Sequence, residues 1–167
     1  MKRLPASVFT VIFLCSTGAL TYGASKSLTV STTVNNACSL SSSDSTLAFG
    51  TYDAMGANAT TPLTQIANIQ LQCTNGTNAR ILLDQGQNPS TTSTDAVPLR
   101  NMTNGTNKLS YYLYTSPART NVWDNVTGVS QMVSGPAQPI SIYGSIPAGQ
   151  NVPAGTYTDT VIISVNY

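Results

Sequence analysis

The sequence predicts an all-β domain built as an antiparallel sandwich of short strands. Helix-type periodicity is almost absent, and short runs rich in β-branched and aromatic residues recur between turn clusters such as Asn75-Gly76 and Asn104-Gly105. Short strands at this spacing are typical of an immunoglobulin-like sandwich, and the lack of crossover helices argues against a parallel sheet. The expected strands cover residues 26–35, 46–52, 66–74, 79–84, 108–115, 139–146 and 157–167.

The last of these strands is the most regular. In an extended segment 157–167, four residues share one face, namely Val161, Ile163, Val165 and Tyr167. Such a strand should lie inside a sheet with a neighbour on each side, yet no further strand follows it in the sequence. We therefore expect an incomplete sandwich in which these four residues face a groove that another chain completes.

A second alternating segment lies near the N-terminus. Leu28, Val30, Thr32 and Val34 alternate with hydroxyl-bearing residues and precede the first cysteine of the expected domain. Two interpretations are open at this point. The segment could pair with the C-terminal strand of the same molecule, or it could leave its own domain and fill the missing edge of a neighbour by β-strand addition.

The first residues are typical of a secretory signal. Lys2 and Arg3 form a positive start, and residues 8–15 form an apolar core too short to span a bilayer. Cleavage is expected between Gly23 and Lys26, so residues 1–24, within one or two positions, should be removed. No membrane insertion is expected after this cleavage.

Export also determines the cysteine chemistry. Cys15 leaves with the signal segment, so Cys38 and Cys73 remain. Two cysteines in an exported chain most simply form one disulfide. In the chain-entropy account, a bridge closing this loop stabilises the fold by roughly 4 kcal/mol.

Composition excludes several classes of function. Charged residues make up 8% of the chain, with 7 basic against 6 acidic residues, so neither nucleic acid nor an anionic membrane is an expected partner. The chain has no histidine and no glutamate, which argues against a zinc site and against histidine-based catalysis. No cofactor is expected. We expect no enzyme, and we interpret the aspartates as solvated turn residues: Asp44, Asp53, Asp84, Asp95, Asp124 and Asp159.

Two other motifs have a functional and a plain interpretation. Tyr111, Tyr112, Tyr114 and Trp123 could form an aromatic platform for sugar, but a strand with one core face and one half-exposed face explains them without a ligand. Asn-X-Ser/Thr sequons are common in a chain this rich in Ser, Thr and Asn, and they occur at Asn58, Asn75, Asn101, Asn104 and Asn125.

A set of ordered motifs resembles the spore coat protein U domain family, which includes the Csu-type subunits of archaic chaperone–usher pili. The resemblance spans nearly the whole expected mature chain and starts with the alternating strand before Cys38. The further matching segments are residues 49–52 (FGTY), 69–73 (IQLQC), 100–102 (RNM), 109–114 (LSYYLY), 118–123 (ARTNVW), 143–150 (YGSIPAGQ) and 153–161 (PAGTYTDTV).

The resemblance implies an incomplete immunoglobulin-like domain, residues 37–167, preceded by a donor-strand extension, residues 25–36. Leu28, Val30, Thr32 and Val34 match the family's donor strand, with Thr32 where a larger aliphatic residue is common. The implied partners are a periplasmic chaperone that lends a strand, an outer-membrane usher, and other pilin subunits in a homo- or hetero-polymer.

The implied function is that of a structural subunit of a surface pilus, exported through the periplasm to a cell-surface fimbrium and serving adhesion and biofilm formation. Completion of each subunit by its neighbour would be donor-strand exchange. A spore-coat or surface-layer protein of the same fold is the first alternative, and a sugar-binding, lectin-like module is the second.

Overall fold

The computed structural model describes residues 18, 23–41 and 46–167. The expected signal segment, residues 1–24, therefore lies almost entirely outside the described residues. The chain divides into two units, Met1–Thr33 and Val34–Tyr167. In the first unit, residues 23–33 form neither helix nor strand, and the side chains of Leu28 and Val30 are 87% and 86% exposed.

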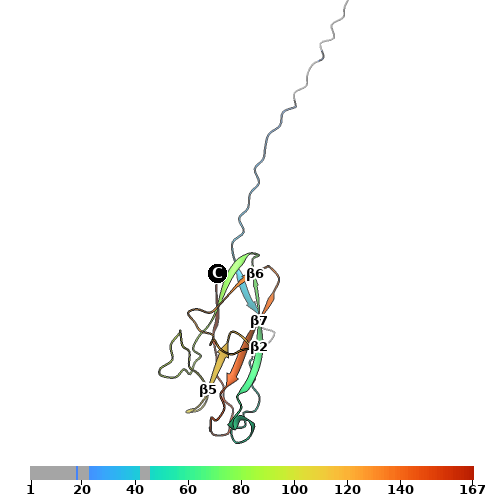
Figure 1. Ribbon diagram of the computed structural model, residues 1–167. Coiled ribbons are helices and arrows are strands. Elements are labelled where there is room, and N and C mark those ends of the chain that lie inside the picture. The colour runs from blue at the N-terminus through green and yellow to red at the C-terminus, as the bar shows by residue number, and fades with distance from the viewer. Residues whose placement is uncertain (1–17, 19–22, 42–45) are drawn as a thin grey trace, which may run out of the picture. The chain divides into compact units, whose positions relative to one another are not determined.

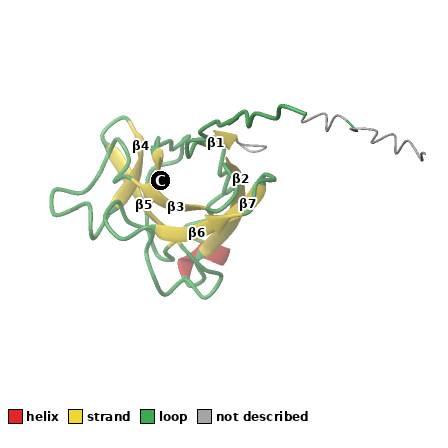
Figure 2. Ribbon diagram, turned by 90° about the horizontal axis from the view of Figure 1, so that it is seen from above, coloured by secondary structure: helices red, strands yellow, loops and turns green. Residues whose placement is uncertain are grey.

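The second unit is all-β and contains two antiparallel sheets that share one core (Figure 1). Within the described residues its helical content is one 3-10 turn, η1 (Ala57–Ala59), drawn in red in Figure 2. The large sheet has the order β1 (Cys38–Ser41), β2 (Leu63–Cys73), β7 (Gln138–Ile146), β5 (Asn107–Tyr114) and β4 (Arg100–Asn104). The small sheet has the order β6 (Val129–Val133), β3 (Thr77–Leu83) and β8 (Ile163–Asn166).

The core forms because alternate residues of each strand face the opposite sheet. Full burial of an aliphatic or aromatic side chain contributes roughly 1.5–3 kcal/mol, so these rows stabilise the sandwich. Trp123 lies at the centre with 1% exposure and donates its indole N–H to the carbonyl of Ile81 at 3.0 Å. The buried rows are Ile69, Leu71 and Cys73 on β2, Ala79, Ile81 and Leu83 on β3, Leu109, Tyr111 and Leu113 on β5, and Ile140, Ile142 and Ile146 on β7.

The all-β antiparallel fold is confirmed, as are the strands expected at 66–74, 79–84, 108–115 and 139–146, which correspond to β2, β3, β5 and β7. The sequence did not reveal β1, β4 and β6, because these strands are short and carry many polar residues that weaken the period-2 pattern.

Three other expected strands differ in the structure. Residues 26–35 and 46–52 are not in strands, and of the expected strand 157–167 only β8 forms a ladder, apart from an isolated bridge between Thr158 and Thr103. A β-strand requires a hydrogen-bonded neighbour. Within the described part of the chain, no neighbouring strand accompanies any of these three segments over its full length.

One covalent bond joins the edge strand β1 to the rest of the large sheet. Cys38 and Cys73 are bonded to one another and lie directly opposite in the β1–β2 register. Because β1 has only four residues, three of them exposed, its own burial contributes little. The bond therefore fixes an edge strand that packing alone would hold weakly.

We expect reduction of this bond to lower the free energy of unfolding by about 4 kcal/mol, because the unfolded chain regains the loop entropy that the bridge removes. Urea unfolding with and without reductant measures the change. The double variant Cys38→Ser/Cys73→Ser should unfold at the midpoint of the reduced protein and should not respond to reductant. An unchanged midpoint after complete reduction contradicts this account of β1.

Candidate functional site

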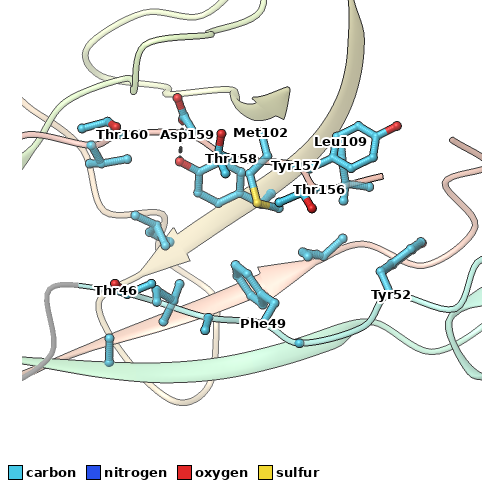
Figure 3. A pocket seen from close by; sticks show the side chains of 18 of the residues that line it. Thr46, Phe49, Tyr52, Met102, Leu109, Thr156, Tyr157, Thr158, Asp159 and Thr160 are labelled. Carbon is cyan, nitrogen blue, oxygen red and sulfur yellow. Dashed lines mark hydrogen bonds between the residues drawn. The ribbon is translucent and has the colours of Figure 1, made fainter. Parts of the chain in front are cut away.

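A groove opens between the two sheets of the second unit. Its cavity has a volume of about 860 Å³ and lies between two walls, residues 46–52 and residues 152–161 with Ile163 (Figure 3). Core-facing residues of β5 and β7 form part of its floor, among them Leu109, Tyr111 and Leu113. The groove is thus lined by side chains of the hydrophobic core along a path bounded by two extended segments.

The first wall, residues 46–52, packs against the large sheet through its side chains. Leu47 and Phe49 lie so close to Gly144 on β7 that a Cβ atom there would be 2.6 Å and 2.7 Å from their side chains. The Phe49 ring meets Tyr111 edge-on at 6.4 Å between centroids. Within the described residues, no backbone–backbone hydrogen bond holds this wall, although the carbonyl of Ala48 accepts from the side-chain amide of Gln65 at 3.2 Å.

The second wall ends in β8, which is paired on one side only. The amide of Asp84 donates to the carbonyl of Ile162 at 3.1 Å, and the register continues with Leu82 opposite Ser164. In an antiparallel ladder, hydrogen-bonded pairs recur at every second residue. The even-numbered residues of β8 therefore bond to β3, and the peptide groups of Val161, Ile163 and Val165 point to the open edge.

The wall before β8 is fixed to the large sheet by polar contacts. Thr158 exchanges two backbone hydrogen bonds with Thr103 of β4, at 2.8 and 3.1 Å. The hydroxyl of Tyr111 on the floor donates to the Asp159 carboxylate at 2.7 Å. The other carboxylate oxygen of Asp159 accepts from the backbone of Gln87 and the side chain of Asn88, so the wall also anchors the polar loop after β3.

A buried cation lies behind this contact. Arg100 on β4 is 1% exposed and donates to the carbonyls of Leu83, Asp84 and Trp123 at 2.6–3.1 Å. The guanidinium thus joins the edge of the large sheet to the end of β3 in the small sheet. Its Nη1 atom is buried without a partner among the described residues, which adds a desolvation cost to the site.

Burial shifts two pKa values in this network. Burial raises the pKa of the Tyr111 phenol, and its hydrogen bond to Asp159 raises it further, so the hydroxyl remains a donor. Burial also lowers the pKa of the Arg100 guanidinium, and this effect is opposed by Tyr111 and the nearby carboxylates of Asp84, Asp159 and Asp124.

The predicted groove residues occupy different positions. Val161 and Ile163 line the cavity, and Val165 packs against the core farther along β8. Tyr167, expected on the same face, is 59% exposed and does not line the cavity, because the ladder ends at Asn166. The expected donor residues Leu28, Val30, Thr32 and Val34 are all exposed.

Sequence reasoning missed the roles of Leu47, Phe49, Tyr111, Asp159 and Arg100 in the groove. Phe49, Tyr111 and Arg100 lie in motifs that carry the family resemblance, but a motif does not say which side chain faces a groove. The sequence predicts an ordinary strand at residues 46–52, which form the first wall of the groove.

The four aromatic residues do not form one platform, and the plain interpretation, a strand with one core face and one half-exposed face, agrees with the structure. Tyr111 and Trp123 are buried in the core, whereas Tyr112 and Tyr114 are half-buried on the opposite face of β5. Of the sequons, Asn58 and Asn101 are buried, and their side chains hydrogen-bond within the fold. These two asparagines have structural roles.

The described residues contain no group of three or more His, Cys, Asp or Glu side chains that could hold a metal ion. In the same part of the chain, no helix has the length and apolar character needed to cross a membrane.

The geometry defines a class of protein: a β-sandwich whose core opens into a groove between two walls with unpaired peptide groups. The model of the Spore Coat Protein U domain matches residues 24–164, and the chain belongs to this family. Protein U of Myxococcus xanthus is 42% identical over 142 residues, covering 80% of this chain and 79% of that protein.

Solved structures share the fold at low sequence identity. One is a chain of the crystal structure of the CsuC–CsuE chaperone–tip adhesion subunit pre-assembly complex from archaic chaperone–usher Csu pili of Acinetobacter baumannii. It has a TM-score of 0.52 and 20% identity, covering 81% of this chain but only 40% of that chain. Another is the P pilus rod subunit PapA, with a TM-score of 0.57, 15% identity, and coverage of 78% and 98%.

We expect Tyr111→Phe to lower the free energy of unfolding by about 1–3 kcal/mol, because Asp159 loses a buried donor. The matched control is Tyr112→Phe, which removes a hydroxyl that makes no hydrogen bond to the described protein. Urea unfolding gives the stability, and amide exchange at Thr158 reports on the wall. Equal effects of the two substitutions would show that the Tyr111–Asp159 contact does not hold the wall.

Proposed function

We propose that this protein is a structural subunit of a surface pilus assembled by a chaperone–usher pathway. Each groove would be filled by the N-terminal strand of another subunit, which is donor-strand exchange. The observation that carries the proposal is the groove itself, because core side chains line it and the edge of β8 beside it has no backbone partner among the described residues.

The N-terminal segment has the chemistry that this groove requires. Leu28, Val30, Thr32 and Val34 place four side chains on one face at period 2, and Leu28, Val30 and Val34 are apolar. In the groove, that face would cover the core while the backbone bonds to Val161, Ile163 and Val165. Full burial of an aliphatic side chain contributes roughly 1.5–3 kcal/mol. Burial of several such side chains in the groove would therefore make a stable contact between two subunits.

Chain connectivity favours a donor from another molecule. Figure 3 places Thr46 toward Thr160 and Tyr52 toward Thr156, so a donor antiparallel to β8 runs along the first wall and ends near Tyr52. The Tyr52 hydroxyl bonds to the carbonyl of Pro147, beside the start of β2. Ala37, in contrast, bonds to Thr74 at the far end of β2.

The two ends of β2 are separated by about 33 Å for an extended strand. Residues 34–37 can span only about 10 Å even when fully extended. In the antiparallel orientation, a subunit therefore cannot insert its own segment. The same geometry poses no obstacle to a donor from a second copy or from another pilin.

An empty groove also explains the proposed partners. Exposed core and unpaired edges promote aggregation, so a subunit in transit needs a temporary strand. A periplasmic chaperone would supply that strand, and an outer-membrane usher would exchange it for the next subunit's N-terminal segment. The proposed location is a cell-surface fimbrium that serves adhesion and biofilm formation.

A second candidate function rests on a separate observation. The 42% identity to Protein U of Myxococcus xanthus, together with the family match over residues 24–164, favours a coat or surface-layer subunit equally well. Strand exchange would join the subunits in both cases. Electron microscopy of the assembled protein separates the two, because thin fibres support the pilus and a continuous layer supports the coat.

We expect Val30→Asp to abolish polymer formation, because it would bury an unpaired carboxylate in the neighbour's groove at a cost of several kcal/mol. The mutant should still bind the chaperone, because that complex uses the groove and not the donor segment. Co-purification with a tagged chaperone and imaging of surface polymers give the two measurements.

The matched control is Thr29→Asp, which adds the same charge on the opposite face of the strand. This variant should still polymerise. Abundant polymer from Val30→Asp would refute the donor assignment, and loss of its chaperone complex would indicate that the segment closes its own domain.

A further inference from the structure

The outer face of the large sheet carries a row of aromatic side chains that the groove does not use. Tyr112 and Tyr114 on β5 point outward because Tyr111 and Leu113 point into the core. Tyr143 on β7 points outward for the same reason. All three tyrosines are half-buried, and they lie across the sheet from the groove, so strand insertion does not cover them.

The strand register brings these side chains together. Tyr114 lies directly opposite Tyr143, and Tyr143 lies opposite Ile66 of β2, which is 49% exposed. Residues opposite one another have Cβ atoms about 4.5–5.5 Å apart. The rings of Tyr112 and Tyr114 are 6.0 Å apart, and none of the three hydroxyls hydrogen-bonds to the described protein.

A notch opens beside Tyr143. Pairing between β5 and β7 covers Tyr143–Ser145 of β7 and stops at Tyr114, whereas β7 continues along β2 as far as Gln138. The notch has a volume of about 210 Å³, and its lining combines the polar residues Thr115, Gln131, Ser141 and Tyr143 with the apolar residues Trp123, Val129, Pro139 and Ile140. This volume is below the roughly 300–1,000 Å³ of drug-sized ligand sites, so it suits one small ring.

The lining favours an uncharged ligand that donates hydrogen bonds. Gln131 donates its amide N–H to Gln138, which leaves its own carbonyl as an acceptor. Ser141 donates its hydroxyl proton to Asn68, which leaves oxygen lone pairs as acceptors. No Asp, Lys or Arg lines the notch, so nothing there compensates the charge of an ionic ligand.

We propose that Tyr143, Tyr114 and this notch bind a pyranose ring of a neutral polysaccharide. A pyranose has an apolar C–H face that can lie on a tyrosine ring, and its hydroxyls donate to acceptors such as those of Gln131 and Ser141. The neutral lining distinguishes this ligand from an acidic glycan. The low basic charge of the whole chain argues against nucleic acid, although bases also stack on aromatic rings.

The test measures depletion of the purified full-length protein from solution by cellulose, chitin and starch granules, with soluble polygalacturonate as the acidic comparison. At least one neutral polymer should bind, and high salt should leave binding intact. Tyr143→Ala should weaken binding roughly tenfold through loss of the aromatic contact. Tyr143→Phe should retain most of it.

The matched control is Tyr167→Ala, which removes an exposed tyrosine directly after β8 and should not change binding. If Tyr143→Ala fails to fold, Gln131→Ala/Ser141→Ala tests the same notch and should also weaken binding. Three results would overturn the proposal. They are no binding to any neutral polymer, binding by the notch variants that equals binding by the unsubstituted protein, and binding to polygalacturonate alone. If a notch variant keeps its polysaccharide binding but loses self-association, the outer face of the large sheet makes contacts between copies of the protein instead.

Discussion

The fold depends on one unsatisfied constraint, which is the open edge of β8. Val161, Ile163 and Val165 direct their peptide groups away from β3, and their side chains pack against the core. Unpaired peptide groups beside exposed core favour any process that adds a strand. The facing wall, residues 46–52, also lacks backbone partners within the described residues, although the Ala48 carbonyl accepts from the Gln65 side chain. We therefore interpret the groove as a site where a strand would pair with the open edge of β8, and not as a pocket for a small molecule.

The two sides of the groove are held in place by specific side-chain contacts. Three contacts on its two sides serve this purpose: Arg100 joins β4 to the end of β3, Tyr111 holds Asp159, and Phe49 packs over Gly144 and Tyr111. The guanidinium is costly to bury, but it bonds to three carbonyls that would otherwise lack donors. The contacts that join the two sheets are thus polar. The surface that a donor strand would cover is apolar.

The sequence predicted the features that leave a period-2 pattern, namely the longer strands and the face that each turns to the core. It identified the inward-facing residues Val161, Ile163 and Val165 in and before β8, the four longer strands, and the two faces of β5. It could not assign Trp123 to the core, because that residue follows a loop whose path depends on tertiary packing. Arg100 was also missed, since a buried cation among carbonyls leaves no periodic signal. Tyr167 was placed on the groove face because alternation alone does not show where a ladder ends.

The central claim is that a strand from another chain pairs with the open edge of β8. Residue-resolved amide exchange of the chain, with and without a synthetic peptide of residues 25–36, tests it most directly. The account predicts that the peptide slows exchange at Val161, Ile163 and Val165. The amides of Ile162, Ser164 and Asn166, which already face β3, should change little. Unchanged exchange at the three odd-numbered residues under saturating peptide would contradict the account.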